Sequence, residues 1–334
     1  MGLAAKTSRG RRRAHARRRV GRFLIVAFPV LLAGPAMACL QGSAVAQMAA
    51  RPTHAVRPFK VGVVCSGVWQ LDQMQPFYWG QSSDVIVLGD WNGSGTVKAG
   101  SFRGGVWLLD FNGNGRWDGA QGGDRLIRLG SKGSTPVLGD WNGSGTTKVG
   151  VFQDGRWALD FNGNGLWDGP DGGDLLFSFG SPGDQPIVGD WDGSGADKIG
   201  VYFAGQWLLD FNGNGQWDGT EGSDRLIRLG TASSIAILGD WNGSGTVKVG
   251  AFTAGEWMLD YNGNGVWDGA EGGDRAFPLG AAGDVPLVGD WNGSGTSKLG
   301  LFRAGRWLLD LDGKGDYRNL ELGDPAAAPV VGAW

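Results

Sequence analysis

The sequence predicts an all-β protein, a six-bladed β-propeller. Three observations predict it: a repeat of fixed length, short strand-like segments within each repeat, and chain ends that complement one another. The tripeptide GDW recurs every 50 residues, with its tryptophan at Trp91, Trp141, Trp191, Trp241 and Trp291. A period of this length indicates a solenoid, a propeller or another array. Glycine, at 64 of 334 residues, indicates many tight turns, and the 17 tryptophans indicate a packed core.

Residues 1–46 have the features of a signal peptide. The arginine-rich stretch RGRRRAHARRRVGRF precedes an apolar run and then small residues. We expect cleavage after Ala46 or Ala38, a linker over 47–58 and the propeller over 59–334. Alternatives are a retained anchor, a lipidated Cys39 and a nucleic-acid-binding arm. The expected location is secreted, periplasmic or on the cell surface, with no membrane span in the mature chain.

The remaining chain is acidic, with 21 basic and 33 acidic residues after the leader. Such a charge repels nucleic acid and anionic membranes, so we expect neither as a partner. Cleavage after Ala46 leaves Cys65 as the one cysteine, which allows no disulfide framework. We expect a monomer.

Each unit contains four segments typical of strands, such as PVLGDW, TKVGVFQ, RWALDF and DLLFSFG in one copy. The second and third are joined by a turn that ends in glycine, as a tight hairpin requires. The glycine before each DW, for example Gly139, is expected beside the propeller axis, where a missing side chain lets backbones approach.

The two chain ends complete one unit. FKVGVVCSGVWQLD, from Phe59, aligns with the second and third strands, FYWG can serve as the fourth, and PVVGAW at the carboxy terminus supplies a first strand. A second marker, G-x-W, occurs six times, at Trp69, Trp107, Trp157, Trp207, Trp257 and Trp307. We therefore predict six blades, closed by pairing of the last strand with the first blade. An open β-solenoid, with capping ends, is the alternative.

The loop between the third and fourth strands has the ligand spacing of a calcium loop. Calcium prefers six to eight oxygen ligands, and EF-hand-like loops supply them from positions one, three, five, seven (by its carbonyl) and nine, with glycine at six. The candidate ligands are Asp110, Asn112, Asn114, Arg116 and Asp118; Asp160, Asn162, Asn164, Leu166 and Asp168; Asp210, Asn212, Asn214, Gln216 and Asp218; and Asp260, Asn262, Asn264, Val266 and Asp268.

Position twelve of these loops is Gln121, Asp171, Glu221 or Glu271. With few carboxylates, we expect Ca²⁺ to bind weakly, with a Kd on the order of 10⁻⁴ to 10⁻³ M. The alternative is that Asn-Gly and Asp-Gly only form turns. A fifth copy has Lys314 and Arg318 at ligand positions and is expected to be empty.

The loop between the first and second strands has a similar order of residues but a lysine at position nine, as in DWNGSGTTK with Asp140 and Lys148. We hypothesise that this ammonium group acts as a built-in cation, bonded to the aspartate and to loop oxygens. The alternative is a solvated lysine. Both loop families are expected on one face of the disc, because strands one and two and strands three and four are joined at the same end.

The pattern D-x-N-x-S-G before a short apolar strand resembles a degenerate FG-GAP or VCBS-type repeat, the family of integrin-like propellers, over Phe59 to Trp334. The resemblance implies an exported or cell-surface protein that acts in adhesion and binding. The calcium loop of that family joins strands one and two. Here that loop lacks the ninth-position carboxylate, so the resemblance does not carry calcium binding over to it.

The expected function is a calcium-stabilised interaction scaffold for an extracellular protein or a glycan, and not an enzyme. The same groups recur in every blade, whereas catalysis needs groups in different roles. One alternative is a lectin that stacks sugars on the WDG tryptophans, which otherwise pack between sheets. Another is a glycosidase that uses aspartates at the channel mouth.

Overall fold

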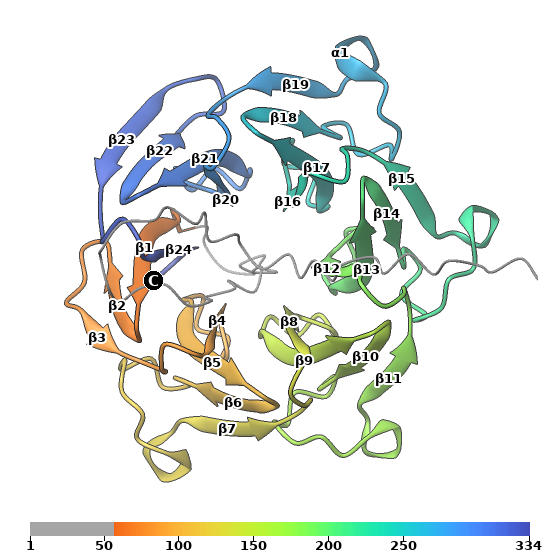
Figure 1. Cartoon of the computed structure of the whole chain (residues 1–334). Coiled ribbons are helices and arrows are strands. Elements are labelled where there is room, and N and C mark those ends of the chain that lie inside the picture. The colour runs from red at the N-terminus through yellow and green to blue at the C-terminus, as the bar shows by residue number, and fades with distance from the viewer. Residues whose placement is uncertain (1–56) are drawn as a thin grey trace, which may run out of the picture.

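Six four-stranded antiparallel sheets surround a common axis in the computed structural model, which describes residues 57–334 (Figure 1). The predicted six-bladed propeller is confirmed. The expected signal peptide and most of the expected linker lie outside the described residues. Within these residues, no helix is long and apolar enough to cross a membrane.

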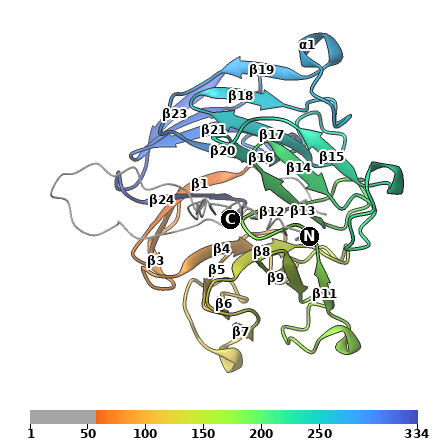
Figure 2. The same cartoon turned by 45° about the vertical axis from the view of Figure 1, so that its right-hand side comes forward.

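The blades follow the chain, and each has its first strand innermost (Figure 2). Blade one contains β24 (Ala328–Gly332), β1 (Lys60–Cys65), β2 (Val68–Leu71) and β3 (Phe77–Tyr78). Blade two contains β4 (Val85–Gly89), β5 (Lys98–Arg103), β6 (Val106–Leu109) and β7 (Arg125–Arg128). Blade three contains β8 (Thr135–Gly139), β9 (Lys148–Gln153), β10 (Arg156–Leu159) and β11 (Leu175–Ser178).

The second half of the ring repeats this order. Blade four contains β12 (Gln185–Gly189), β13 (Lys198–Phe203), β14 (Gln206–Leu209) and β15 (Arg225–Arg228). Blade five contains β16 (Ile235–Gly239), β17 (Lys248–Thr253), β18 (Glu256–Leu259) and β19 (Arg275–Pro278). Blade six contains β20 (Val285–Gly289), β21 (Lys298–Arg303), β22 (Arg306–Asp310) and β23 (Tyr317–Glu321). Short 3-10 turns (Ala120–Gly122, Pro170–Gly172, Thr220–Gly222) and α1 (Gly269–Gly272) precede the fourth strands of blades two to five.

The ring closes as predicted, because β24 pairs antiparallel with β1 and Val61 lies opposite Val331. Inter-blade hydrogen bonds also run around one face of the disc. In each bond, the residue just before the second strand of a blade donates its N–H to a backbone carbonyl of the preceding blade. Thr147, for example, donates to the carbonyl of Asp90 at 2.9 Å. The bonds from Phe59 to Asp290 and from Val97 to Ala333, both 2.8 Å, continue this set across the chain ends.

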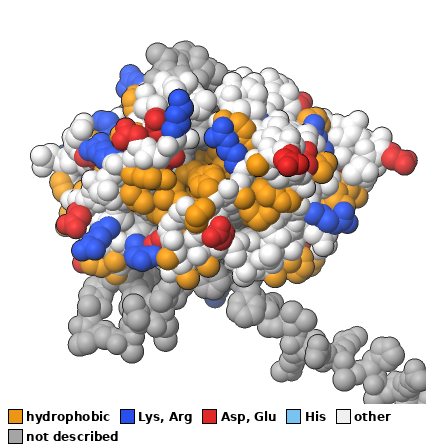
Figure 3. Space-filling model, turned by 90° about the horizontal axis from the view of Figure 1, so that it is seen from above, with side chains coloured by type: hydrophobic (Ala, Val, Ile, Leu, Met, Phe, Trp, Pro, Cys, Tyr) orange, Lys and Arg blue, Asp and Glu red, His pale blue; other side chains and the backbone are white. Residues whose placement is uncertain are grey.

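The G-x-W tryptophans form the centre of the packing. Their rings are at most 1 % exposed, and each indole N–H donates to a carbonyl just beyond the fourth strand of its own blade, as Trp157 does to Phe179 at 2.9 Å. Burial of such large side chains between sheets supplies much of the hydrophobic stabilisation. On the outer wall, apolar side chains form a band with charged side chains above and below it (Figure 3).

The structure corrects two expectations from the sequence, one about the glycine before DW and one about Cys65. The glycine before DW makes room for an indole instead of a neighbouring backbone: a Cβ on Gly139 would lie 2.4 Å from the Trp141 ring. Cys65 is disulfide-bonded, whereas the expected cleavage after Ala46 would leave it without another cysteine to pair with. The other cysteine of the sequence, Cys39, lies outside the described residues.

Candidate functional site

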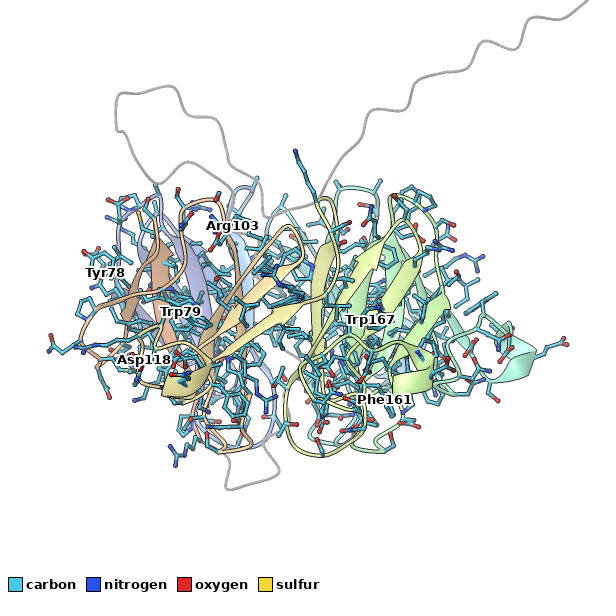
Figure 4. The ribbon with its side chains drawn as sticks, turned by 90° about the horizontal axis from the view of Figure 1, so that it is seen from below. Tyr78, Trp79, Arg103, Asp118, Phe161 and Trp167 are labelled. Atoms are coloured by element: carbon cyan, nitrogen blue, oxygen red, sulfur yellow. The ribbon has the colours of Figure 1, made fainter. Side chains whose placement is uncertain are left out.

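Both Asp/Asn-rich loop families lie on one face of the disc. Asp118 and Phe161, from two of the 3–4 loops, lie toward that face in Figure 4, and Arg103 of a 2–3 hairpin lies toward the other. The two loops of one blade also touch. Asn142 of a 1–2 loop donates from Nδ2 to the carbonyl of Phe161 at 3.0 Å, and the same bond joins Asn92 to Phe111 and Asn242 to Tyr261.

The 1–2 loops hold a lysine ammonium at their centre. Lys148 Nζ lies 2.7 Å from Asp140 Oδ1, 2.6 Å from Ser144 Oγ and 3.0 Å from the carbonyl of Thr146. The side chain of Lys148 is only 4 % exposed. The equivalent lysines Lys98, Lys248 and Lys298 make the same bonds. The built-in cation is therefore confirmed in these four loops, and the solvated lysine is wrong there.

Blade four has a variant of this arrangement. Lys198 Nζ bonds Asp192 Oδ1 at 2.5 Å and Ser194 Oγ at 2.8 Å. Burial alone would raise the pKa of Asp192, but hydrogen bonds from Lys198 and Ser194 lower it to about 2. An aspartate thus replaces asparagine at position three and becomes the partner of the ammonium group.

The 3–4 loops fold around the aspartate at position one. Asp110 Oδ1 accepts the N–H groups of Gly113 (2.9 Å) and Asn114 (3.1 Å), and its Oδ2 accepts that of Gly115 at 2.9 Å. Asn112 Oδ1 accepts the N–H of Asn114 at 2.9 Å. Gly113 and Gly115 have φ values of 80° and 73°, which favour glycine. The sequence pattern that predicts a calcium loop is therefore also the pattern that the turn itself requires.

The structure brings together only some of the predicted ligands. In blade two, Asp110 and Asn112 at positions one and three both accept the backbone N–H of Asn114 at position five. Positions five and nine also meet, since Asn114 Nδ2 donates to Asp118 Oδ2 at 2.5 Å and Asn164 Nδ2 donates to Asp168 Oδ2 at 3.0 Å. At position seven the side chains are exposed, which leaves the backbone carbonyl as the donor that the pattern predicts. Position twelve is exposed in the 3-10 turns or α1, as for Gln121 and Glu221.

A second buried aspartate completes each loop and was missed in the sequence. Asp124 Oδ1 accepts the N–H of Phe111 at 3.2 Å, and its Oδ2 accepts that of Asp118 at 2.7 Å. Asp174, Asp224 and Asp274 make the same two bonds. The signal was present: an aspartate stands 14 residues after position one in all four copies, directly before the fourth strand.

Each loop therefore contains two buried carboxylates. The position-one aspartates and their partners are 1–3 % exposed. Within the described residues, none of them has a lysine or arginine nitrogen within 4.0 Å. Burial raises the pKa of Asp110; the N–H groups of Gly115 and Gly113 lower it, and the charge of Asp124 raises it again, with a net rise. The pKa values of Asp160, Asp210 and Asp260 are likewise raised, chiefly by burial.

This donor set fits a hard cation of modest affinity. Two carboxylates, two asparagine amides and backbone oxygens are ligands that calcium accepts. Asp110 Oδ1 already accepts two N–H groups, whereas Oδ2 accepts one and keeps a second lone pair. No cluster of three His, Cys, Asp or Glu side chains suited to a metal occurs within residues 57–334. The fifth copy in blade six has Asp310 bonded to Gly313 and Gly315, and the aspartate at the same spacing, Asp324, follows β23 instead of preceding it, so it is not equivalent to Asp124.

The WDG tryptophans lie between blades and remain partly open. Trp117 and Trp217 are 42 % and 40 % exposed, and they pack edge-on against Trp79 and Phe179 of the preceding blade. Trp167 and Trp267 pack against the cores of blades two and four. Figure 4 shows Trp167 on the side of the disc. These tryptophans thus contribute to blade packing, and two of them also offer ring surface to solvent.

No protein-family model matches the chain, and no curated protein matches it. Among solved structures, it is similar to an Agrocybe aegerita lectin that recognises non-reducing terminal N-acetylglucosamine. The identity is 16 %, the TM-score is 0.49, and the match covers 84 % of this chain and 96 % of the lectin. It is also similar to part of the Photorhabdus luminescens Tc holotoxin pore, with 17 % identity and a TM-score of 0.46, over 76 % of this chain and 12 % of that one.

Proposed function

We propose that this protein is a binding scaffold of the FG-GAP/VCBS type that acts outside the cell and is stabilised by Ca²⁺ in the 3–4 loops of blades two to five. The observation that carries the proposal is the pair of buried carboxylates, such as Asp110 and Asp124, found in each loop without an ion-pair partner. Burial of charge is costly unless it is compensated. A bound cation supplies that compensation.

In blade two, the residues that would hold the ion are Asp110, Asn112, Asn114 and Asp118, with the carbonyl of Arg116. Asp124 lies behind them and binds the N–H of Asp118. The ion supplies positive charge and fixes the loop; it takes no part in a reaction. The 1–2 loops need no ion, because their lysines already provide the charge.

Binding fits the arrangement of groups better than catalysis. The described residues contain no histidine, and the carboxylate pair recurs in four blades, each time with a glycine N–H donating to the position-one aspartate. Identical groups at regular intervals suit a repetitive or multivalent partner, whereas an acid and a base in one site need different surroundings. We therefore propose that the protein is not an enzyme.

A glycan is a second candidate partner because two WDG tryptophans, Trp117 and Trp217, present open ring surface beside polar loops. Aromatic faces and nearby amide and carboxylate groups are suited to sugars. A glycan array separates this candidate from a protein partner. Binding that is lost in Trp117→Ala and Trp217→Ala, with the melting temperature retained, would support it.

Calcium-dependent thermal unfolding tests the main proposal. The full chain in 5 mM CaCl₂, roughly five times the weaker end of the Kd range, should melt several degrees higher than in chelator. Magnesium at the same concentration serves as the control, because it requires a smaller octahedral site and should stabilise less. Equal melting temperatures with calcium and with chelator would refute calcium stabilisation.

A further inference from the structure

The four 3–4 loops differ in what the preceding blade presents to them. A Cβ at position six would meet Phe77 in blade two (Gly115, 3.1 Å) and Phe177 in blade four (Gly215, 2.9 Å). In blade three the neighbours of Gly165 are Ile127 and Arg125 Nη1, and in blade five Gly265 faces Ile227 and Arg225. Neighbouring blades therefore alternate between an aromatic contact and an arginine contact.

Each arginine is fixed between two blades. Arg125 lies over the Phe111 ring of its own blade, 4.0 Å from the centroid, and its Nη1 donates to the carbonyl of Gly163 in the next loop at 3.2 Å. Arg225 lies 3.9 Å from the centroid of Phe211 and donates to Gly263 at 3.1 Å. Stacking and the carbonyl bond together hold the guanidinium group beside the loop.

These guanidinium groups lie near the position-one aspartates. One small hollow is lined by Arg225, Lys248 and Asp260, and the equivalent hollow is lined by Arg125, Lys148 and Asp160. In blades two and four, an aromatic ring faces position six of the loop, where blades three and five have the arginine.

We infer that Arg125 and Arg225 set the cation affinity of the loops, so that blades two and four contain the stronger divalent-cation sites and blades three and five the weaker ones. The inference rests on the proposed calcium function. A fixed positive charge beside a loop already compensates part of its buried negative charge and repels a dication. The expected difference in Kd is at least about tenfold, given one unit charge within several ångströms at a partly buried site.

Calorimetric titration of the full chain with CaCl₂ tests the inference. The wild type should show two stronger and two weaker sites. Asp110→Asn with Asp210→Asn should remove the stronger pair, and Asp160→Asn with Asp260→Asn should remove the weaker pair. Four sites of equal affinity would overturn the inference and leave the calcium proposal standing, whereas no binding heat at all would overturn both.

Exchange of the arginines gives a matched pair of variants. In the register of the blades, Leu175 of β11 occupies the position of Arg125, since Leu159 pairs with Leu175 as Leu109 pairs with Arg125. Arg125→Leu should strengthen the blade-three site about tenfold, and Leu175→Arg should weaken the blade-four site by a similar factor. Arg128→Leu, at the exposed far end of β7, is the control and should change neither Kd. Unchanged affinities in both exchange variants, with native circular dichroism, would overturn the assignment.

Discussion

Gly139 and Trp141 depend on one another at the inner edge of blade three. The indole N–H of Trp141 donates to the carbonyl of Val149 at 3.4 Å, and its ring covers the Cα of Gly139. The same pair recurs at the end of the ring, where a Cβ on Gly332 would lie 2.6 Å from the Trp334 ring. The glycine of GDW is thus required by the volume of the tryptophan.

Gly139→Ala should lower the free energy of unfolding by about 1–3 kcal/mol, the usual cost of forcing a methyl group into a packed site. Urea denaturation measures this cost. The cause can be isolated with a double-mutant cycle: in a Trp141→Leu background, the alanine should cost much less. An undiminished cost in that background would show that the ring is not the obstacle.

Lys148 has a structural role that a surface lysine lacks. Lys148→Met keeps the length of the side chain but removes the ammonium group from Asp140, and we expect a loss of about 3 kcal/mol, because breaking a buried pair leaves an uncompensated charge. Lys132→Met, at an exposed link position, is the matched control and should cost under about 0.5 kcal/mol. Equal stabilities of the two variants by chemical denaturation would contradict the buried ion pair.

The 3–4 loop makes stability depend on pH in an unusual direction. Position-one aspartates have raised pKa values in the folded protein, so the folded state holds protons more tightly than the unfolded chain, whose value is near 3.8. Their contribution to stability therefore falls as pH rises through the raised pKa values. Asp192 has the opposite effect, because its pKa is lowered to about 2 in the folded protein. Its contribution to stability is lost as the pH falls from about 3.8 toward 2.

In calcium-free buffer, acidification from pH 7 to pH 4, close to the value of the unfolded chain, should consequently destabilise the parent less than a variant with Asp110, Asp160, Asp210 and Asp260 all changed to asparagine. Added calcium should diminish this difference, since an ion competes with protons for the carboxylates. Melting curves at both pH values provide the measurement. If parent and variant respond identically to pH, the raised pKa values are not linked to folding.

The sequence was a good guide to the position of the loops and to the residues that form their turns. Asp110, Asn112 and Asn114 could be identified as turn-forming residues because their side chains accept backbone N–H groups at the spacing that the pattern predicts; their role as calcium ligands stays a prediction. Position twelve could not be placed, because the turn before the fourth strand directs Glu221 to solvent. Asp124 lies outside the EF-hand-like spacing, and only its fixed distance from Asp110 together with its place directly before the fourth strand indicated a role.

Ring closure rests on the last strand. Val330 is fully buried, and Ala333 accepts the inter-blade hydrogen bond from Val97. A chain that ends at residue 327 should lose cooperative unfolding, because β1 loses its inner partner and the cores on both sides of blade one are opened. A chain extended after Trp334 by a short Gly-Ser tail controls for changes at the terminus. Melting of the shortened chain at the parent temperature would contradict closure by β24.

The blade count and the closure could be predicted because each blade repeats its markers and the two chain ends hold complementary parts of one blade. Contacts between blades could not be predicted. The alternation of Phe77, Arg125, Phe177 and Arg225 beside successive loops depends on which side chain of a fourth strand reaches the loop of the next blade. The repeat pattern defines each blade but does not describe how two successive blades face one another.

The pairing of β24 with β1 also imposes an order on folding. The ribosome makes β1 before blades two to six and β24 after them, so the sheet of blade one keeps one edge unpaired until β24 has been made. Blades two to six contain all of their own strands and can form in turn, whereas blade one is completed only after β24 has been made. In a nascent chain, blades two to six are therefore expected to become resistant to protease before blade one does.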